Sequence, residues 1–264
     1  MNCCGLLFVV CCLSSVVCGL SSSSWSEVCL RNNMFIISTD PKQEKRILKA
    51  RARCQKKFRF YFPKGFKDQT YKEWERNYKW NAHVQWAEQL NPEEFSGLLS
   101  AEQYVEIANR AVRIETKTNL LFSFEKMALR DAVRTPSSAK AFATGLFNYL
   151  YGKESLMQRF EKFIEVVEHL PRKQTRVLTW PLVTVFGFIA KPEEFIFLKP
   201  KVTKIAAEKY AYDFYYGSRP NWETYESLLG LANQVDKDLA DWKPIDMIDI
   251  QSFLWVLGSD EYPD

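Results

Sequence analysis

Hydrophobic positions recur every three to four residues along most of the chain after residue 70. Between residues 153 and 170, the positions that keep this spacing are Leu156, Phe160, Phe163, Val167 and Leu170. This is the period of an amphipathic α-helix that packs one face against a core. No pair of alternating segments is joined by an Asn-Gly or Asp-Gly turn, which would indicate a hairpin. The pattern predicts an all-α fold, predominantly helical, with a single globular domain.

Helix start and stop signals divide this pattern. Asn91 before Pro92, Asn221 and Asp246 are typical N-caps, and Gly152 is a typical helix end. Ser100 to Gln103 is interpreted as a capping box that opens a helix to residue 113. The remaining helices are expected at 71–90, 118–129, 139–150, 153–170, 180–190, 200–210, 221–239 and 245–257, although the β-branched content of 180–190 also allows a strand. Three segments follow: 1–33, a basic arm and loop at 34–70, and a helical domain at 71–264.

The first 33 residues differ from the rest. The apolar run at residues 6–17 is too short to span a bilayer. Its length suits the hydrophobic region of a signal peptide, with a cleavage site between Val17 and Gly19. However, no basic residue precedes the run, and the first one is Arg31. The alternative is that Met34 is the true start and that residues 1–33 are translated upstream sequence.

The cysteines bear on the same question. Six of the seven fall in the first 29 residues, and only Cys54 lies beyond them. A secreted disulfide scaffold spreads its cysteines through its core. A start at Met34 therefore predicts a reduced, cytoplasmic protein without a membrane span in its body. A cleaved signal peptide would instead give a secreted protein with Cys29 and Cys54 as a potential pair.

A strongly basic segment runs from residue 40 to residue 59. It carries nine Lys and Arg residues against Asp40 and Glu44, and an aromatic run follows it. Basic side chains release counterions when they contact phosphates, which favours an arm that tracks nucleic acid through Arg46, Arg53 and Lys57. The alternative is a solvated helix face with an aromatic anchor.

Several common chemistries lack their residues. There is no Cys-x-x-Cys, no His-Glu-x-x-His, no glycine-rich nucleotide loop and no Gly-x-Ser-x-Gly, and the chain has two histidines. We therefore expect no metal site and no cofactor. His83 lies three residues from both Trp80 and Trp86, which is typical of a packing histidine.

Residues 176–257 carry a weak family resemblance. An apolar stretch at 178–190 precedes a phrase that reads Pro192, Phe195, Phe197, Leu198 and Val202. This order resembles the core of the helix-hairpin-helix DNA glycosylases, which implies a related fold and a nucleic-acid partner. In that family an aspartate in this phrase assists base excision, but this chain has Lys199 there and lacks the hairpin glycines. An ammonium would repel the cationic sugar that forms, so standard base excision is not expected.

A second resemblance covers residues 119–262. The stretches at 178–181 and 247–256 resemble an uncharacterised family of bacterial proteins. It implies no activity, and it favours Met34 as the start.

Two groups of residues are candidates for binding. Lys199, Lys201 and Lys204 crowd the first turn of a helix that begins at Pro200, where partial positive charge makes lysines unfavourable unless an anion binds. Arg219 would join this anion site, and Trp222 would stack on a nucleotide. The alternatives are solvated lysines and a Trp222 that anchors its helix behind the cap Asn221.

Three functions remain open from the sequence. The first is an uncharacterised helical protein that binds nucleic acid. The second is a divergent lyase or hydrolase of nucleic acid with Asp249 or Lys199 as the catalytic group, which requires Asp249 to lie near Lys199 or His83. The third is a non-catalytic module for protein interaction, in which the aromatic stripe of Trp74, Trp80 and Trp86 is partly exposed. The oligomeric state and the substrate cannot be predicted from the sequence.

Overall fold

The structure is a computed structural model that describes residues 40–264. Residues 45–264 form one compact unit. The predictions for residues 1–33 lie outside the described residues. The helices are α2 (Pro41–Tyr61), α3 (Gln69–Tyr71), α4 (Asn77–Gln89), α5 (Pro92–Ser100), α6 (Tyr104–Thr116), α7 (Ser123–Ala132), α8 (Pro136–Tyr151), α9 (Leu156–Glu168), α10 (Trp180–Ala190), α11 (Pro200–Lys209), α12 (Trp222–Asp238) and α13 (Met247–Gly258).

The all-α prediction is confirmed, because residues 40–264 contain helices and turns but no strand. Short helical turns lie at Gly65–Lys67 and Ala240–Trp242, and a π-helical turn joins α3 to α4 at Lys72–Arg76. None of the helices in this range is long and apolar enough to cross a membrane.

The helix caps follow the local sequence at most positions. Asn91 accepts from the backbone N–H of Glu94 at 2.9 Å, and Asn221 accepts from that of Thr224 at 2.8 Å. The capping box predicted at Ser100 is wrong. Ser100 is the last residue of α5, and the chain turns through Glu102 at a φ of 56° before α6 begins. The backbone N–H of Gln103 bonds back to Leu98, which closes α5 instead of opening a helix.

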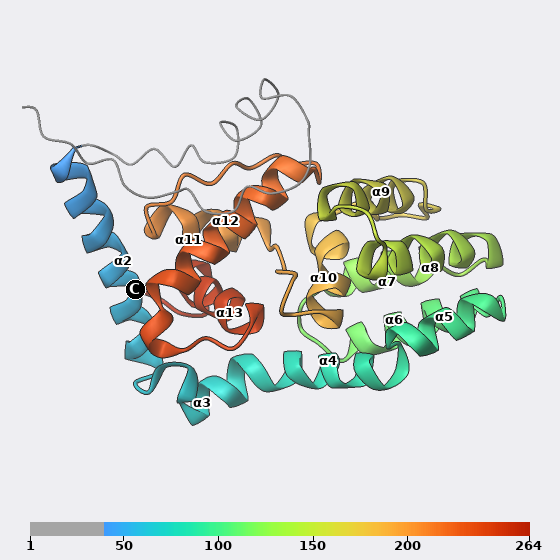
Figure 1. Cartoon of the computed structure of the whole chain (residues 1–264), viewed down its shortest axis with the longest axis horizontal. Helices are drawn as coiled ribbons and strands as arrows, with labels where there is room; N and C mark the ends of the chain where they lie inside the picture. Colours follow the sequence, from blue (N-terminus) through green and yellow to red (C-terminus); the bar gives the residue numbers. More distant parts are fainter. Residues whose placement is uncertain (1–39) are drawn as a thin grey trace, which may run out of the picture. The chain divides into compact units, whose positions relative to one another are not determined.

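Helix α10 is the centre of the core. All of its residues are buried, and it packs against α4, α6, α8 and α9 (Figure 1). Helical packing on every side explains why a segment with β-branched residues does not form a strand. Gly187 is required here, because a Cβ at this position would lie 2.8 Å from the ring of Phe195.

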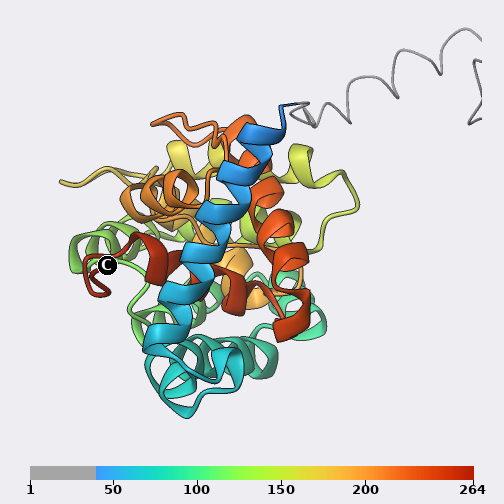
Figure 2. The same ribbon diagram turned by 90° about the vertical axis from the view of Figure 1, so that its left-hand side faces the viewer.

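Helix α13 is the second buried helix, and it packs against α11 and α12. The basic helix α2 crosses the face of the molecule in Figure 2 and buries Cys54 and Phe58. The Phe58 ring centroid lies 5.4 Å from that of Phe253 in α13. From Lys45 onward the basic segment thus belongs to the same compact unit as residues 71–264, with one face packed and the other in solvent.

Candidate functional site

One face of α2 carries a row of exposed cations. Arg46, Lys49, Arg53 and Lys56 are spaced by three, four and three residues, and all are exposed. Residues at this spacing lie on the same side of a helix. Within residues 40–264, none of these four side chains has an acidic or hydrogen-bonding partner. We call this row the basic stripe, and the exposed ring of Phe60 continues it.

Two other cations of α2 are paired with carboxylates. Arg51 lies 3.0 Å from Asp238, and Lys57 lies 2.7 Å from Asp264. Of the three arm residues predicted to contact phosphates, Arg46 and Arg53 therefore lie in the basic stripe, whereas Lys57 belongs to an ion pair.

A second feature is a cleft of about 580 Å³. The N-cap residues of α7, α10 and α11 all line it, and they are Phe122, Thr179 and Lys199. Helix N-termini carry partial positive charge, and Arg176, Lys199 and Lys201 also line the cleft, as do the acidic residues Glu125, Asp260 and Glu261. We call it the Lys199 cleft.

Lys199 is largely buried at the wall of this cleft. Its Nζ donates to the carbonyl oxygen of Leu120 at 2.9 Å and lies 3.5 Å from the centroid of the Phe122 ring. Burial lowers the pKa of the Lys199 amine, while Glu125 and Glu115 act in the opposite direction. The cleft therefore contains an amine that loses its proton more easily than a solvated lysine does.

Two exposed phenylalanines lie beside this amine. The rings of Phe122 and Phe124 are stacked, with centroids 5.5 Å apart and an angle of 21° between the planes. Their side chains are 54% and 51% exposed, which is high for large apolar rings. Arg176 is exposed at the edge of the cleft and has no partner within the described part of the chain. Exposed rings beside cations are typical of surfaces on which unpaired bases stack.

The other residues predicted for the anion site are distributed differently. Lys201 lines the cleft but pairs with Asp260 at 2.7 Å, and Lys204 lies over the ring of Tyr216 at 4.6 Å. Arg219 pairs with Glu168 at 2.7 Å in a separate cavity that is lined by glutamates. The structure thus brings Lys199 and Lys201 together and places Arg219 with an acidic surface.

Trp222 is half-buried on the core side of α12. Its ring lies 6.1 Å from that of Phe160 and 6.2 Å from that of Tyr225. This is the packing of a residue that anchors its helix behind the Asn221 cap.

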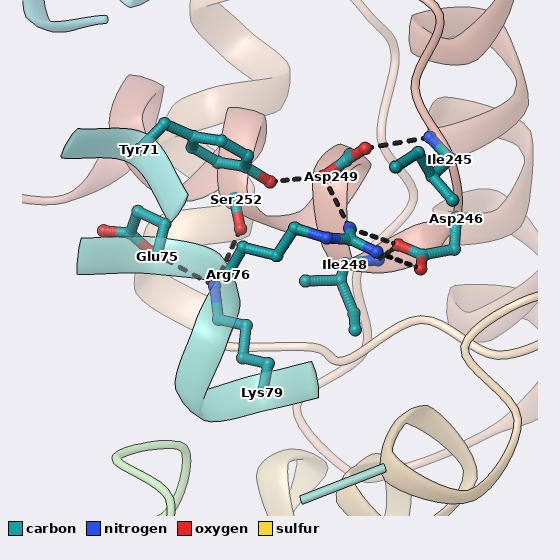
Figure 3. Close-up of polar contacts among 9 residues, drawn as sticks. All are labelled: Tyr71, Glu75, Arg76, Lys79, Ile245, Asp246, Ile248, Asp249 and Ser252. Atoms are coloured by element: carbon teal, nitrogen blue, oxygen red, sulfur yellow. Dashed lines mark hydrogen bonds and ion pairs between the residues drawn. The ribbon is translucent and has the colours of Figure 1, made fainter. Parts of the chain in front are cut away.

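Asp249 lies in a buried polar network at the start of α13 (Figure 3). Its carboxylate accepts from the Oη of Tyr71 at 2.5 Å, from Nη1 of Arg76 at 2.7 Å and from the backbone N–H of Ile245 at 2.8 Å. Arg76 also donates to both oxygens of Asp246. Both oxygens of the Asp249 carboxylate therefore accept from donors of the protein itself.

Asp249, Lys199 and His83 do not form one site. Asp249 does not line the Lys199 cleft, and the two residues bind different groups. Nδ1 of His83 lies 3.0 Å from the carbonyl oxygen of Ile189 in α10, and His83 does not line the Lys199 cleft. The structure brings no acid–base pair together from these three residues.

The tryptophans of the helix expected at residues 71–90 have different environments. Trp74 is 60% exposed and Trp80 is 40% exposed, but Trp86 is 1% exposed. The expectation of a partly exposed stripe is wrong at Trp86, because its ring packs near Phe186 in the core.

Four buried polar residues were missed from the sequence: Tyr71, Glu75, Arg76 and Lys79. Lys79 Nζ donates to Glu75 at 3.1 Å and to Ser252 at 2.8 Å (Figure 3). The sequence contains a signal for this burial, because positions 71, 75, 79, 82 and 86 keep a helical spacing and the last two are Ala82 and Trp86. The polar residues are therefore the first half of a buried face. Phe122 and Phe124 were also missed, and their spacing alone does not indicate exposure.

Within residues 40–264, no group of His, Cys, Asp and Glu side chains is arranged to hold a metal ion. No model of a protein family, no curated protein and no solved structure matches the chain. The resemblances to helix-hairpin-helix DNA glycosylases and to a bacterial family therefore stay predictions.

Proposed function

We propose that this protein binds single-stranded nucleic acid, with the basic stripe on the phosphates and the Lys199 cleft on an unpaired base. The observation that carries the proposal is the stripe itself, in which four exposed cations lack partners among residues 40–264. From Arg46 to Lys56 it extends about 15 Å along the helix axis, at about 1.5 Å per residue. This length covers several phosphates of a strand.

The Lys199 cleft favours binding of a single strand over binding of a duplex. A base can stack on the Phe122 and Phe124 pair only when it is unpaired, and each such contact contributes about 1–3 kcal/mol. Lys199 and Arg176 add positive charge beside the rings. The glycosylase resemblance also favours a nucleic-acid partner, and Lys199 at the position of the family's aspartate argues against standard base excision.

The test is fluorescence anisotropy of a labelled oligothymidylate and of a matched duplex, measured over a range of NaCl concentrations. The slope of log K against log salt is about −0.7 per phosphate contacted in a single strand, so Arg46→Ala with Lys49→Ala should reduce it by about 1.4. Lys237→Ala, an exposed cation on α12, is the matched control and should leave the slope unchanged. Binding without salt dependence, or an unchanged slope in the double variant, contradicts the proposal.

The cleft is tested by a separate change. Phe124→Ala removes one exposed ring and should weaken binding of the single strand about 5- to 150-fold, which corresponds to about 1–3 kcal/mol. Binding of the duplex should change much less. Equal losses for both substrates would exclude base stacking at this position.

A second candidate function uses the amine of Lys199, and the observation that favours it is the burial that lowers its pKa. A neutral amine attacks the aldehyde carbon of an abasic nucleotide, and loss of water then forms an imine. Borohydride would reduce this imine to a stable link between the protein and the oligonucleotide. A covalent product that Lys199→Arg abolishes supports a lyase, and its absence in the parent protein rejects this candidate.

A further inference from the structure

A larger hollow lies between α2 and the C-terminal end of α11. Its volume is about 950 Å³, within the range of small-molecule sites. Much of its wall is apolar and includes Ala50, Cys54, Tyr61, Leu257 and Pro263. We call it the α2–α11 hollow, and neither the anion site nor the base-stacking site uses these walls.

Two lysines of the hollow meet at one carboxylate. Nζ of Lys57 and Nζ of Lys209 lie 2.7 Å and 2.8 Å from the same oxygen, Oδ1 of Asp264. Their hydrogen bonds hold the pKa of Asp264 at about 2. A pair of ammonium groups is therefore already arranged around one carboxylate at the apolar wall.

The carboxylate in this position can be exchanged. The side chain of Asp264 is 68% exposed, whereas that of Lys57 is 12% exposed. Ion pairs with a solvated partner contribute little to stability, so a competing carboxylate has little to displace. All three side chains line the hollow, but that of Lys57 is largely buried and would stay in place when the exposed carboxylate of Asp264 moves away.

We propose that the α2–α11 hollow binds a single-chain anionic amphiphile, a long-chain carboxylate. Its carboxylate replaces Asp264 between Lys57 and Lys209, and its alkyl chain lies along the apolar wall. From Lys57 back to Ala50 this wall follows α2 for about 10 Å, at about 1.5 Å per residue. Arg53 and Lys56, which also line the hollow, add positive charge near the head group.

The charge pattern distinguishes this ligand from other classes. A neutral lipid would leave the two lysines without a gain, and an oligonucleotide would leave the apolar wall uncovered. Arg53 and Lys56 belong both to the basic stripe and to the lining of the hollow, but the proposal rests on Lys57, Lys209 and the apolar wall, which lie outside the stripe.

The test is isothermal titration of the full chain with decanoate, laurate and the neutral dodecanol, each as a monomer. Two added methylenes should raise the affinity about fifteenfold from decanoate to laurate, because each buried methylene contributes a factor of about four. Dodecanol should bind at least tenfold more weakly than laurate. Lys57→Ala with Lys209→Ala should weaken laurate binding, and Lys237→Ala should not.

Asp264→Asn gives the most specific result. It removes the competing carboxylate, so laurate should bind more tightly than to the parent protein. Tighter binding also shows that the variant is folded. Absent laurate binding, equal affinity for dodecanol, or weaker binding by Asp264→Asn would each overturn the proposal. If oligothymidylate displaces laurate, and if laurate and decanoate bind with equal affinity, the hollow would instead be assigned to nucleic acid.

Discussion

Asp249→Asn is the sharpest test of the buried network that joins the first helices to α13. The substitution keeps the size of the side chain but removes its charge. The carboxylate accepts three hydrogen bonds and is fully buried. An amide has one acceptor oxygen, so if this oxygen faces Tyr71 and Arg76, its NH₂ group must face the N–H of Ile245.

The magnitude follows from these contacts. A hydrogen bond to a charged group contributes about 1.5–3 kcal/mol, and a buried donor without a partner costs about 1–3 kcal/mol. Arg76 keeps its two contacts with Asp246, so its charge stays paired. We therefore expect the free energy of unfolding to fall by about 3 kcal/mol, at the lower end of the cost of breaking a buried ion pair.

The assay is urea unfolding followed by circular dichroism at neutral pH. Asp241→Asn is the matched control, because Asp241 is exposed and should change the free energy of unfolding by less than about 0.5 kcal/mol. A double-mutant cycle with Arg76→Leu should show a coupling energy of at least about 1 kcal/mol. A loss below about 0.5 kcal/mol in Asp249→Asn would refute the reasoning.

Two further predictions concern α2 and the core. Burial raises the pKa of the Cys54 thiol from 9.0 to about 11, so between these pH values the folded protein keeps a proton that the unfolded chain loses. The free energy of unfolding should therefore fall as the pH rises through this window, by on the order of 2 kcal/mol. Urea unfolding at pH 8 and 10.5 should show a loss of stability that is larger in the parent than in Cys54→Ala by this amount, and an equal loss in both contradicts it. Gly187→Ala places a methyl group 2.8 Å from Phe195 and should lower the free energy of unfolding by about 1–3 kcal/mol. Gly97→Ala in α5 is the control, because its added methyl group meets no atom within 4 Å, and it should raise the free energy of unfolding by about 0.5–1 kcal/mol. If Gly97→Ala instead lowers the free energy of unfolding as much as Gly187→Ala does, the clash with Phe195 is not the cause of the loss.

Part of the candidate site could be predicted from the sequence. The excess of positive charge in residues 40–59 identified the helix on which the basic stripe lies. The helix start at Pro200 identified Lys199 as unusual. Which of these cations are free was not predictable, because partners such as Asp264 and Asp260 lie far away along the chain. The exposure of the stacked phenylalanines was also not predictable, because it depends on the turn after α6, which leaves Phe122 and Phe124 at the surface.

The sequence by itself determined the all-α class and most helix ends. Caps such as Asn91 and Asn221 bind backbone groups three residues away, so nearby residues contain all the information. Ser100 shows the limit, because the bond from Gln103 to Leu98 belongs to the preceding helix.

Only the tertiary structure decided the environment of each charged residue. Asp249 is held by Tyr71, 178 positions away, and Arg219 by Glu168, 51 positions away. Burial and ion pairing depend on which elements pack together, and helical periodicity does not specify this. For the same reason Asp249 lies in a closed network, whereas Lys199 lies at a cleft.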